Sequence, residues 1–179
     1  MKAALFLVFI LLGLPTRGWA EVLSQLPDEN NHLFFTRILP KEAALMHPPI
    51  RGRFGPSDHN LLLLFQTNKS GVGPFEGMIL VPNRNVPGSY TKHILPIPDG
   101  MVGLVDVHAV FFVNADKKEG NELLILCSQM SGMGPDGAKE WYQTYVYGWN
   151  GNGFELQESL LKKLSNLRTS AEVKRVLSK

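Results

Sequence analysis

The sequence predicts a mainly β protein in which two tandem antiparallel meanders pack as a small sandwich, followed by one or two C-terminal helices. At a constant offset of 61 residues, Leu62–Phe65 matches Leu123–Leu126, and the loop Ser70–Pro74 matches Ser131–Pro135. The two apolar runs are short and bounded by turn residues, as in strands that are covered on both faces. After residue 156 the leucines change to helical spacing. Two related β units with a helical tail are therefore expected.

The first twenty residues predict a signal peptide. Met1-Lys2 is a basic start, residues 3–14 are an unbroken apolar run, and Gly18-Trp19-Ala20 offers small residues where a signal peptidase cuts. The run is shorter than the roughly 20 apolar residues of a membrane span. We expect cleavage near Ala20, a single β-rich domain over residues 21–179, and a periplasmic or secreted location without a stable membrane anchor.

Charge and cysteine content narrow the choice of partners. Without the leader, which carries Lys2 and Arg17, the chain has 16 basic and 16 acidic residues. Nucleic-acid binding rests on a clustered excess of Lys and Arg, so no nucleic-acid partner is expected. The local excess in residues 157–179 is typical of a solvated helical face. Cys127 is the only cysteine, so no internal disulfide can form, and we expect a buried, inert thiol.

The region before the first unit is predicted from local patterns alone. Residues 33–39 are interpreted as a first strand, and residues 40–46 as a short helix with proline at its first position. Residues 51–57 are interpreted as a turn-rich link. The first unit, about residues 58–96, then contains three predicted strands, at 61–66, 77–81 and 90–95.

The second unit, about residues 104–156, begins with an alternating strand. The alternation in residues 104–113 predicts Asp106 and His108 on one face, with five apolar side chains on the other: Val105, Val107, Ala109, Phe111 and Val113. Further strands are predicted at 123–127, 144–149 and 153–156, and Asn150-Gly151 is a strong hairpin signal between the last two.

The helical tail, residues 157–179, predicts two short amphipathic helices. The leucines from Leu156 to Leu167 follow helical spacing, and Thr169–Glu172 forms a capping-box sequence. Helices this short are not stable alone in water. We expect their apolar faces to cover an open end or edge of the β structure.

The turn NADKKEGNEL, Asn114–Leu123, places acidic and amide side chains immediately before a strand. It resembles the loops of FG-GAP and VCBS-type β-propeller repeats in exported bacterial proteins, where a DxDGDGxxEL turn precedes a strand. The resemblance implies a calcium loop in which Asn114, Asp116 and Glu122 supply oxygen ligands. Lys118 departs from the pattern, because an ammonium group supplies no oxygen and repels the ion. The alternative is a turn held by Asx-type hydrogen bonds, in which Glu122 accepts from backbone amides.

The SGxGP loops and two polar strand residues are the remaining places where chemistry could occur. The loops lack the Lys of a phosphate-binding P-loop and the GxSxG spacing of a nucleophile elbow, so they are interpreted as backbone turns. Asp106 and His108 share a strand face and are the catalytic candidates, as an acid–base pair or part of a metal site. A solvated strand face explains them equally well. No cofactor motif is recognised.

The aromatic segment before residue 150 is the candidate binding surface. Tyr145, Tyr147 and Trp149 alternate on one face of a predicted strand, with Trp141 and Tyr142 just before them. Large amphipathic rings give contact area for sugar rings or peptide side chains. The alternative is that these rings belong to the core.

These features favour an exported, non-enzymatic binding protein of the bacterial envelope that recognises a protein or glycan partner. The alternative is a small envelope polysaccharide hydrolase that uses strand carboxylates such as Asp106 or Glu122. A third hypothesis is a structural subunit that forms a homodimer to complete its sheet.

Overall fold

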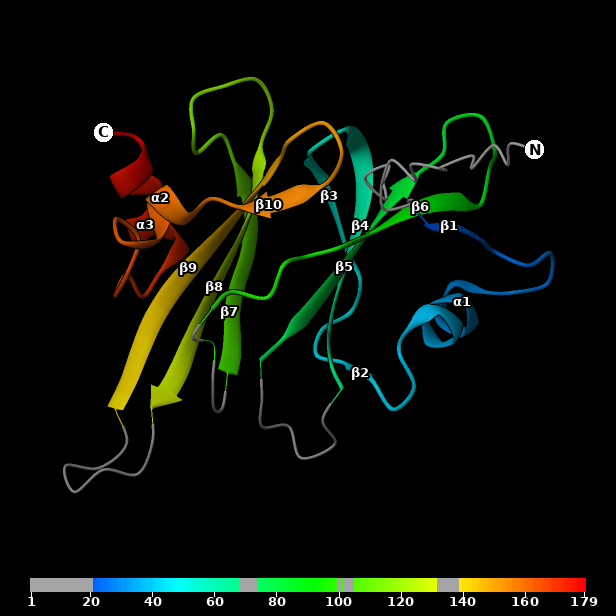
Figure 1. The fold of residues 1–179 in the computed structure, drawn as a ribbon, viewed down its shortest axis with the longest axis horizontal. Helices are drawn as coiled ribbons and strands as arrows, with labels where there is room; N and C mark the ends of the chain where they lie inside the picture. The colour runs from blue at the N-terminus through cyan, green and yellow to red at the C-terminus, as the bar shows by residue number, and fades with distance from the viewer. Residues whose placement is uncertain (1–20, 68–73, 100, 102–104, 132–138) are drawn as a thin grey trace, which may run out of the picture.

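The computed structural model describes residues 21–67, 74–99, 101, 105–131 and 139–179. Two antiparallel sheets face each other, with helices on their outer sides (Figure 1). The first sheet has the order β1 (Glu21–Ser24), β6 (Ser89–Ile94), β5 (Glu76–Pro82), β4 (Ser57–Gln66) and β2 (Ala44–Leu45), and β3 (Ile50–Phe54) also pairs with β4. The second has the order β10 (Phe154–Leu156), β9 (Lys139–Trp149), β8 (Glu122–Ser131) and β7 (Val105–Val113). The predicted mainly β fold with two packed sheets is confirmed.

The predicted leader, residues 1–20, and most of both SGxGP loops lie outside the described residues. The described residues include three helices, α1 (Asn31–Ile38), α2 (Glu158–Leu161) and α3 (Ser170–Leu177). None of these three helices has the length and apolar character that a membrane span requires.

The apolar runs of β4 and β8 are buried on both faces, which makes the molecule a four-layer structure. Leu62 and Leu64 of β4, with Leu123 and Ile125 of β8, fill the core between the sheets. The intervening leucines point outward, under α1 on the first sheet and under α3 on the second. Each fully buried leucine contributes about 1.5–3 kcal/mol of transfer free energy. Coverage on both sides explains why the sequence shows runs and not alternation.

The offset of 61 residues corresponds to equivalent positions in the two sheets. Leu62 of β4 pairs with Ile79 of β5, and Leu123 of β8 pairs with Tyr147 of β9. All four side chains lie in the core between the sheets. The strands β3, β4, β5 and β6 of the first unit pair with one another in the same order as β7, β8, β9 and β10 of the second unit. The internal repeat in the amino-acid sequence therefore corresponds to a repeated strand topology.

The prediction for residues 33–46 is wrong, because capping and tertiary packing decide this region. Asn30 accepts a hydrogen bond from the amide of Leu33 and starts α1, whose Phe34 and Phe35 are buried against the first sheet. Residues 40–46 do not form a helix: Glu42 has a φ of 70°, and the segment ends in β2. Proline at the first position of a helix is permissive, and it does not by itself start one.

Two further strands were not predicted in the first sheet. Residues 51–57, interpreted as a link, contain most of β3 and the turn to β4, in which Gly55 has a φ of 60°. The short edge strand β1 pairs with β6. Both are exposed on part of their surface, so their hydrophobic pattern is weak.

The predicted alternation of β7 is interrupted by a β-bulge. Val107 pairs with Cys127 but Ala109 pairs with Leu126, so His108 is an extra residue in the strand. A bulge shifts the side chains that follow it to the opposite face. The prediction that Val105, Val107, Ala109, Phe111 and Val113 share one face is therefore wrong: the first two face the core between the sheets, and the last three face the helical layer.

The tail forms the two predicted helices, but they cover a sheet face and not an end or edge. Leu164, Val173 and Leu177 are buried against Leu124 and Leu126 of β8. The capping box is present: the Thr169 side chain accepts from the amide of Glu172, and the Glu172 carboxylate accepts from the amide of Thr169. The outer face of the second sheet is thus completed by the end of the chain.

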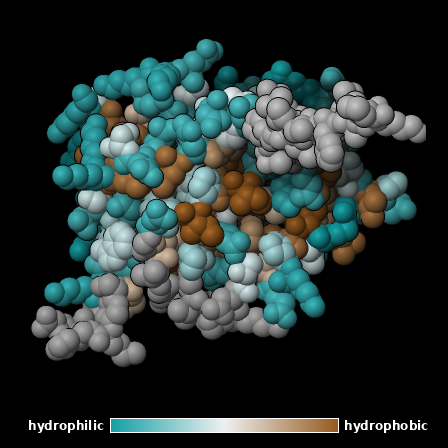
Figure 2. Space-filling model, in the orientation of Figure 1, coloured by the Kyte–Doolittle hydropathy of each residue, from teal (hydrophilic) through white to brown (hydrophobic). Residues whose placement is uncertain are grey.

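Figure 2 shows how polarity is distributed over one face of the molecule. Hydrophobic side chains gather in the middle of this face, near the seam between the sheets. The upper margin, where the β7–β8 hairpin ends, is mainly hydrophilic. The polar margin is where the candidate site lies.

Candidate binding cleft at the hairpin ends

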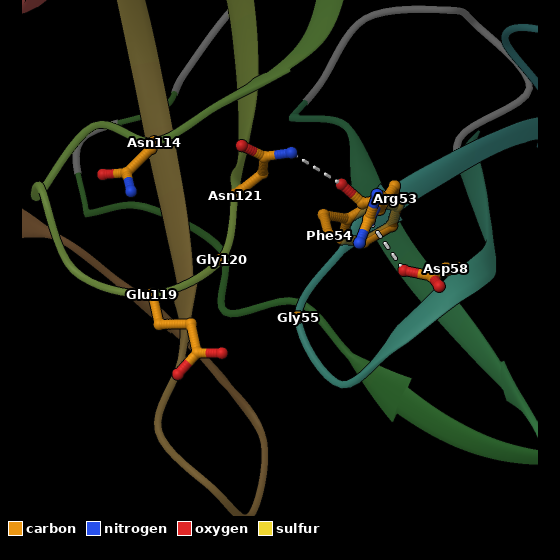
Figure 3. Close-up of a pocket in the computed structure, with 8 residues that line it drawn as sticks. All are labelled: Arg53, Phe54, Gly55, Asp58, Asn114, Glu119, Gly120 and Asn121. Atoms are coloured by element: carbon orange, nitrogen blue, oxygen red, sulfur yellow. Dashed lines mark hydrogen bonds and ion pairs between the residues drawn. The ribbon is translucent and has the colours of Figure 1, made fainter.

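Two equivalent hairpins, one from each unit, meet at one end of the sandwich. The amide of Gly55, in the β3–β4 turn, donates to the carbonyl of Asn121, which precedes β8, at 3.3 Å. The Asn121 side-chain amide donates to the carbonyl of Arg53, also at 3.3 Å (Figure 3). These two hydrogen bonds hold the hairpin ends together across the joint between the units.

A cavity of about 560 Å³ lies between the two hairpin ends. We call it the rim cleft, and it is lined by Arg53, Phe54, Gly55, Asp58, Asn114, Glu119, Gly120 and Asn121. On one wall the Arg53 Nε lies 2.8 Å from the Asp58 Oδ1 (Figure 3). On the other wall stand Asn114, Glu119 and Asn121. The volume falls within the range of about 300–1,000 Å³ that is common for ligand sites.

The rim cleft rests on the rigid core between the sheets. The ring of Phe54 is buried and stacks on Phe112 of β7, with 4.7 Å between ring centroids and an interplanar angle of 2°. Stacked rings in a packed interior move little, because the surrounding side chains occupy the available space. The Phe54 ring that lines the cleft is therefore held in place by a ring of the second unit.

A second cavity of about 230 Å³ lies beside the rim cleft. It shares Gly55, Glu119, Gly120 and Asn121 with the cleft, and we call it the side pocket. Its other lining residues come from the β7–β8 loop and from β9, β10 and the residues around them: Asp116, Lys118, Glu122, Gly148, Trp149, Asn150, Glu155 and Gln157. The turn that ends at Asn121 thus has a cavity on each side.

The β7–β8 loop is held by its own polar side chains. The Asp116 Oδ1 accepts from the amide of Lys118 at 2.9 Å, and the Lys118 Nζ lies 3.1 Å from the Asp116 Oδ2. The Asn114 side-chain amide donates to the carbonyl of Lys118. The buried Glu122 accepts from the amide of Ala115 at 2.5 Å. This is the alternative that the sequence left open, a turn of Asx-type hydrogen bonds.

The candidate metal ligands Asn114, Asp116 and Glu122 all take part in the hydrogen bonds within the loop. Among the described residues, no group of three or more His, Cys, Asp or Glu side chains is arranged to hold a metal ion. Burial opposes ionisation of Asp116, but the hydrogen bonds and charge of Lys118 outweigh it and lower the pKa. Burial raises the pKa of Glu122. The positive charge beside the Asp116 carboxylate is therefore that of Lys118.

The catalytic candidates Asp106 and His108 lie on the helical side of the second sheet, away from the rim cleft. The His108 Nε2 lies 2.8 Å from the hydroxyl of Ser128, and its ring packs on Tyr142 at 5.4 Å. No hydrogen bond joins Asp106 to His108 in the part of the chain that the structure describes. The predicted pair is not assembled as an acid–base unit.

The serine beside His108 belongs to a buried polar cluster. Hydrogen bonds from Ser128, and then from the Tyr142 hydroxyl at 3.0 Å, lower the pKa of Glu140. The Ser128 hydroxyl thus contacts both the His108 ring and the Glu140 carboxylate. Ser128 is also only 2% exposed. This cluster fixes Tyr142, over which the Arg168 guanidinium lies at 5.2 Å, and so ties the helical tail to the sheet.

The predicted aromatic binding surface is mainly core. Tyr145 and Tyr147 are 3% and 0% exposed, between the two sheets. The Tyr145 hydroxyl accepts from the Gln129 side chain at 2.6 Å, and the Tyr147 hydroxyl donates to a linker carbonyl, that of Pro96, at 3.2 Å. Burial raises the pKa of Tyr145 to about 12. These two rings cannot form a stacking surface.

The other three aromatic candidates are only partly buried and are spread over two faces. Trp149 packs against Phe154 at 5.1 Å and lines the side pocket. Tyr142 pairs with Ser128 and faces the helical layer, whereas its neighbour Trp141 pairs with Gln129 on the core side. Of the five predicted rings, Trp149 is the one that borders a candidate site. The predicted inert thiol is also found, because burial raises the pKa of Cys127 to about 12.

Of the residues that line the rim cleft, Asn114 was a sequence candidate, as a metal ligand, and the others were not. Arg53 lies in a segment interpreted as a link, and Glu119 and Asn121 lie in a loop considered only for metal ligands. The signal that could have found them was the repeat itself. Asp58 stands in the first unit at the place of the acidic loop in the second, so both loops should reach the same end of the sandwich.

Comparisons with protein-family models, with curated proteins and with solved structures give no match for the chain. The resemblance to FG-GAP and VCBS-type loops therefore stays a prediction from ten residues of sequence.

Proposed function

We propose that the protein is an exported, non-enzymatic binding protein of the bacterial envelope, and that a protein segment or a glycan occupies the rim cleft. One observation carries the proposal: a cavity of about 560 Å³, lined mainly by polar groups, lies at the joint of two hairpins that are hydrogen-bonded to each other. A cleft held open by internal hydrogen bonds binds without a large cost for ordering its walls.

The wall groups support binding of a polar partner. Each wall presents hydrogen-bonding side chains that have one internal partner, such as Arg53 with Asp58 and Asn121 with the Arg53 carbonyl. The remaining donor and acceptor positions of these groups are available to a ligand. An apolar ligand would leave them without partners, at a cost of about 1–3 kcal/mol each. The signal peptide predicted from the sequence supports a partner outside the cytoplasm.

The proposal is tested by retention of envelope components on the purified protein. The double variant Glu119→Ala/Asn121→Ala removes two polar side chains from one wall of the rim cleft. The matched control is Asp28→Ala/Asn85→Ala, because both of its residues are exposed and line neither cavity. We expect the wild type and the control to retain the same component and the cleft variant to lose it. Equal retention by all three proteins would reject the cleft as the site.

The same preparation distinguishes binding from hydrolysis. Incubation of the wild type with cell-wall fractions, followed by chromatography of the soluble products, should give no released fragments. Release that depends on Asp106 or Glu122 would instead support the polysaccharide hydrolase.

A further inference from the structure

We infer that the ligand of the rim cleft is an uncharged oligosaccharide, whose chain runs from the rim cleft across the Gly120 turn into the side pocket. The inference rests on the proposed function and names its ligand class. It combines three observations: the mixture of donors and acceptors on the walls, the balance of charge, and two cavities that share one turn.

The mixture of donors and acceptors fits vicinal hydroxyl groups. A sugar hydroxyl donates one hydrogen bond and accepts others, so neighbouring hydroxyls need acceptors and donors side by side. The rim cleft offers the guanidinium of Arg53 beside the carboxylate of Asp58, with the Glu119 carboxylate on the opposite wall. Hydrogen bonds that involve charged groups are the stronger ones, and Arg53 and Glu119 can each engage two oxygens of a ligand.

The charges around the two cavities disfavour anions. In the rim cleft Arg53 is paired with Asp58, which leaves the negative charge of Glu119 in excess. In the side pocket Lys118 is paired with Asp116, which leaves the carboxyl groups of Glu119, Glu122 and Glu155. A phosphate, a carboxylate or a nucleic acid would be repelled from both cavities. A neutral, hydroxyl-rich chain avoids this repulsion and still uses the carboxylates as acceptors.

The two cavities adjoin at the turn that contains Gly120, which lines both of them. Gly120 has a φ of 104°, and a side chain added there would meet no atom within 4 Å. The space above the turn is therefore open, and the neighbouring residues Glu119 and Asn121 line both cavities. Volumes of about 560 and 230 Å³ suit a chain with its larger part in the rim cleft and its end in the side pocket. There Trp149 offers a partly exposed ring to the C–H face of a sugar.

The test uses β-1,4-linked N-acetylglucosamine oligomers of one to four units, with cello-oligomers of the same lengths, titrated by calorimetry into the purified protein. We expect affinity to rise about tenfold or more from the single sugar to the longer chains, because only these reach both cavities. Glu119→Ala and Asn121→Ala should each weaken binding about tenfold or more. Asp28→Ala, the matched control for Glu119→Ala, should bind as the wild type does.

Two results would overturn the inference. The first is an affinity that does not depend on chain length or on Glu119. The second is no saturable binding of either oligomer series at about 10 mM, a concentration at which even weak sites fill. If the envelope component is still retained through the cleft in the second case, the ligand is a protein segment and the proposed function stands. If retention is also independent of the cleft, both proposals fail. Circular dichroism of each variant separates loss of binding from loss of fold.

Discussion

The two β units share a core but differ at their hairpin ends, and the difference places the candidate site. Leu62 and Leu123 occupy equivalent positions in β4 and β8, and both face the core between the sheets. The β3–β4 connection is only the pair Gly55-Pro56, whereas the β7–β8 connection is the loop of residues 114–121. The β7–β8 loop is hydrogen-bonded to the β3–β4 turn, and the rim cleft lies between them. The core shared by the two units therefore fixes the position of the long β7–β8 loop relative to the short β3–β4 turn.

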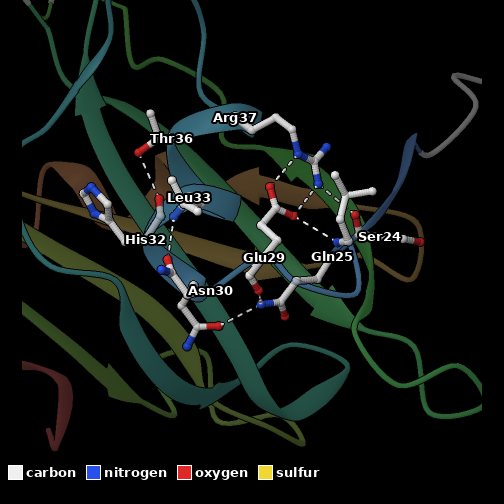
Figure 4. A network of polar contacts seen from close by, with 10 residues as sticks. Ser24, Gln25, Glu29, Asn30, His32, Leu33, Thr36 and Arg37 are labelled. Atoms are coloured by element: carbon white, nitrogen blue, oxygen red, sulfur yellow. Dashed lines mark hydrogen bonds and ion pairs between the residues drawn. The ribbon is translucent and has the colours of Figure 1, made fainter.

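The outer faces of the two sheets are covered by different means. The first sheet carries α1, from before the unit, and the second carries α2 and α3, from after it (Figure 1). Helix α1 is tied to β1 through Arg37, which donates to both oxygens of the Glu29 carboxylate at 2.7 and 2.8 Å and to the Ser24 carbonyl at 2.9 Å (Figure 4). Helix α3 depends on its capping box and on apolar contacts. The pKa of Glu29 is lowered to about 2 by Arg37, and the pKa of Glu172 is lowered by the backbone amides that it accepts from, so acid should weaken both covers.

The largest expected effect tests whether the two cores are equivalent. Leu62→Ala and Leu123→Ala each leave a cavity in the same layer, and each should lower the free energy of unfolding by about 2–5 kcal/mol. Urea denaturation followed by tryptophan fluorescence measures both. A loss at one position that exceeds the other by more than about 2 kcal/mol would show that the two strands do not play equivalent parts.

The next effect tests the seam between the units at Gly52 of β3. A Cβ at this position would lie 2.2 Å from the ring of Phe112, which is itself stacked on Phe54. Gly52→Ala should cost about 1–3 kcal/mol because the stacked rings must shift. Gly153→Ala is the control, since a Cβ there meets no atom within 4 Å. Equal unfolding midpoints for the two variants would contradict the close contact.

The helix caps should have a smaller effect, of similar size in the two units. Asn30→Ala and Thr169→Ala each remove a side chain that accepts from a backbone amide at the start of a helix. Each should cost about 1 kcal/mol. Thermal unfolding of the two variants, with His32→Ala as an exposed helical control, measures the difference. A cost only for Asn30→Ala would indicate that α3 is held by packing alone.

Acid should distinguish Glu29, beside helix α1, from Glu122 of β8, because the pKa values of these two carboxyl groups are shifted in opposite directions. The hydrogen bonds from Arg37 lower the pKa of Glu29 from 4.5 to about 2, so its contribution to stability is present above pH 4.5 and lost as the pH falls towards 2. Burial raises the pKa of Glu122, so its contribution is present below pH 4.5 and lost as the pH rises through the folded-state value. Denaturation of Glu29→Gln and Glu122→Gln between pH 2.5 and 7 should give pH slopes that differ from the wild type in opposite directions. Slopes that change in the same direction would contradict this assignment.

The smallest effect is expected from the polar cluster on the helical side of the second sheet. Asp106 and His108 lie on β7, on the side away from the rim cleft. The variants Asp106→Ala and His108→Ala should therefore retain the ligand as the wild type does, within error. Ligand retention by these two variants is compared with retention by Glu119→Ala in the same assay. If either variant is folded but no longer retains the ligand, the binding site is on the sheet face and not at the hairpin ends.

The sequence by itself determined the repeated apolar strands, the order of the elements in the second unit and the capped C-terminal helix. These follow from patterns within a few residues: buried strands need unbroken apolar runs, and a capping box needs only Thr169 and Glu172. The same kind of local pattern wrongly predicted a strand in the segment that forms α1. Phe34 and Phe35 are apolar neighbours in either structure, and only the first sheet beneath them decides that a helix buries both.

Only the tertiary structure decided which side chains share a face and which loops meet. The bulge at His108 moves three apolar residues of β7 to the helical side, and no alternation in the sequence reveals where a strand gains an extra residue. Tyr145 and Tyr147 lie in the core because the first sheet covers them. The rim cleft joins Arg53 to Asn121, 68 residues apart, through hydrogen bonds that exist only after both sheets have packed. A site made by two distant hairpins depends on long-range packing, which local sequence patterns do not specify.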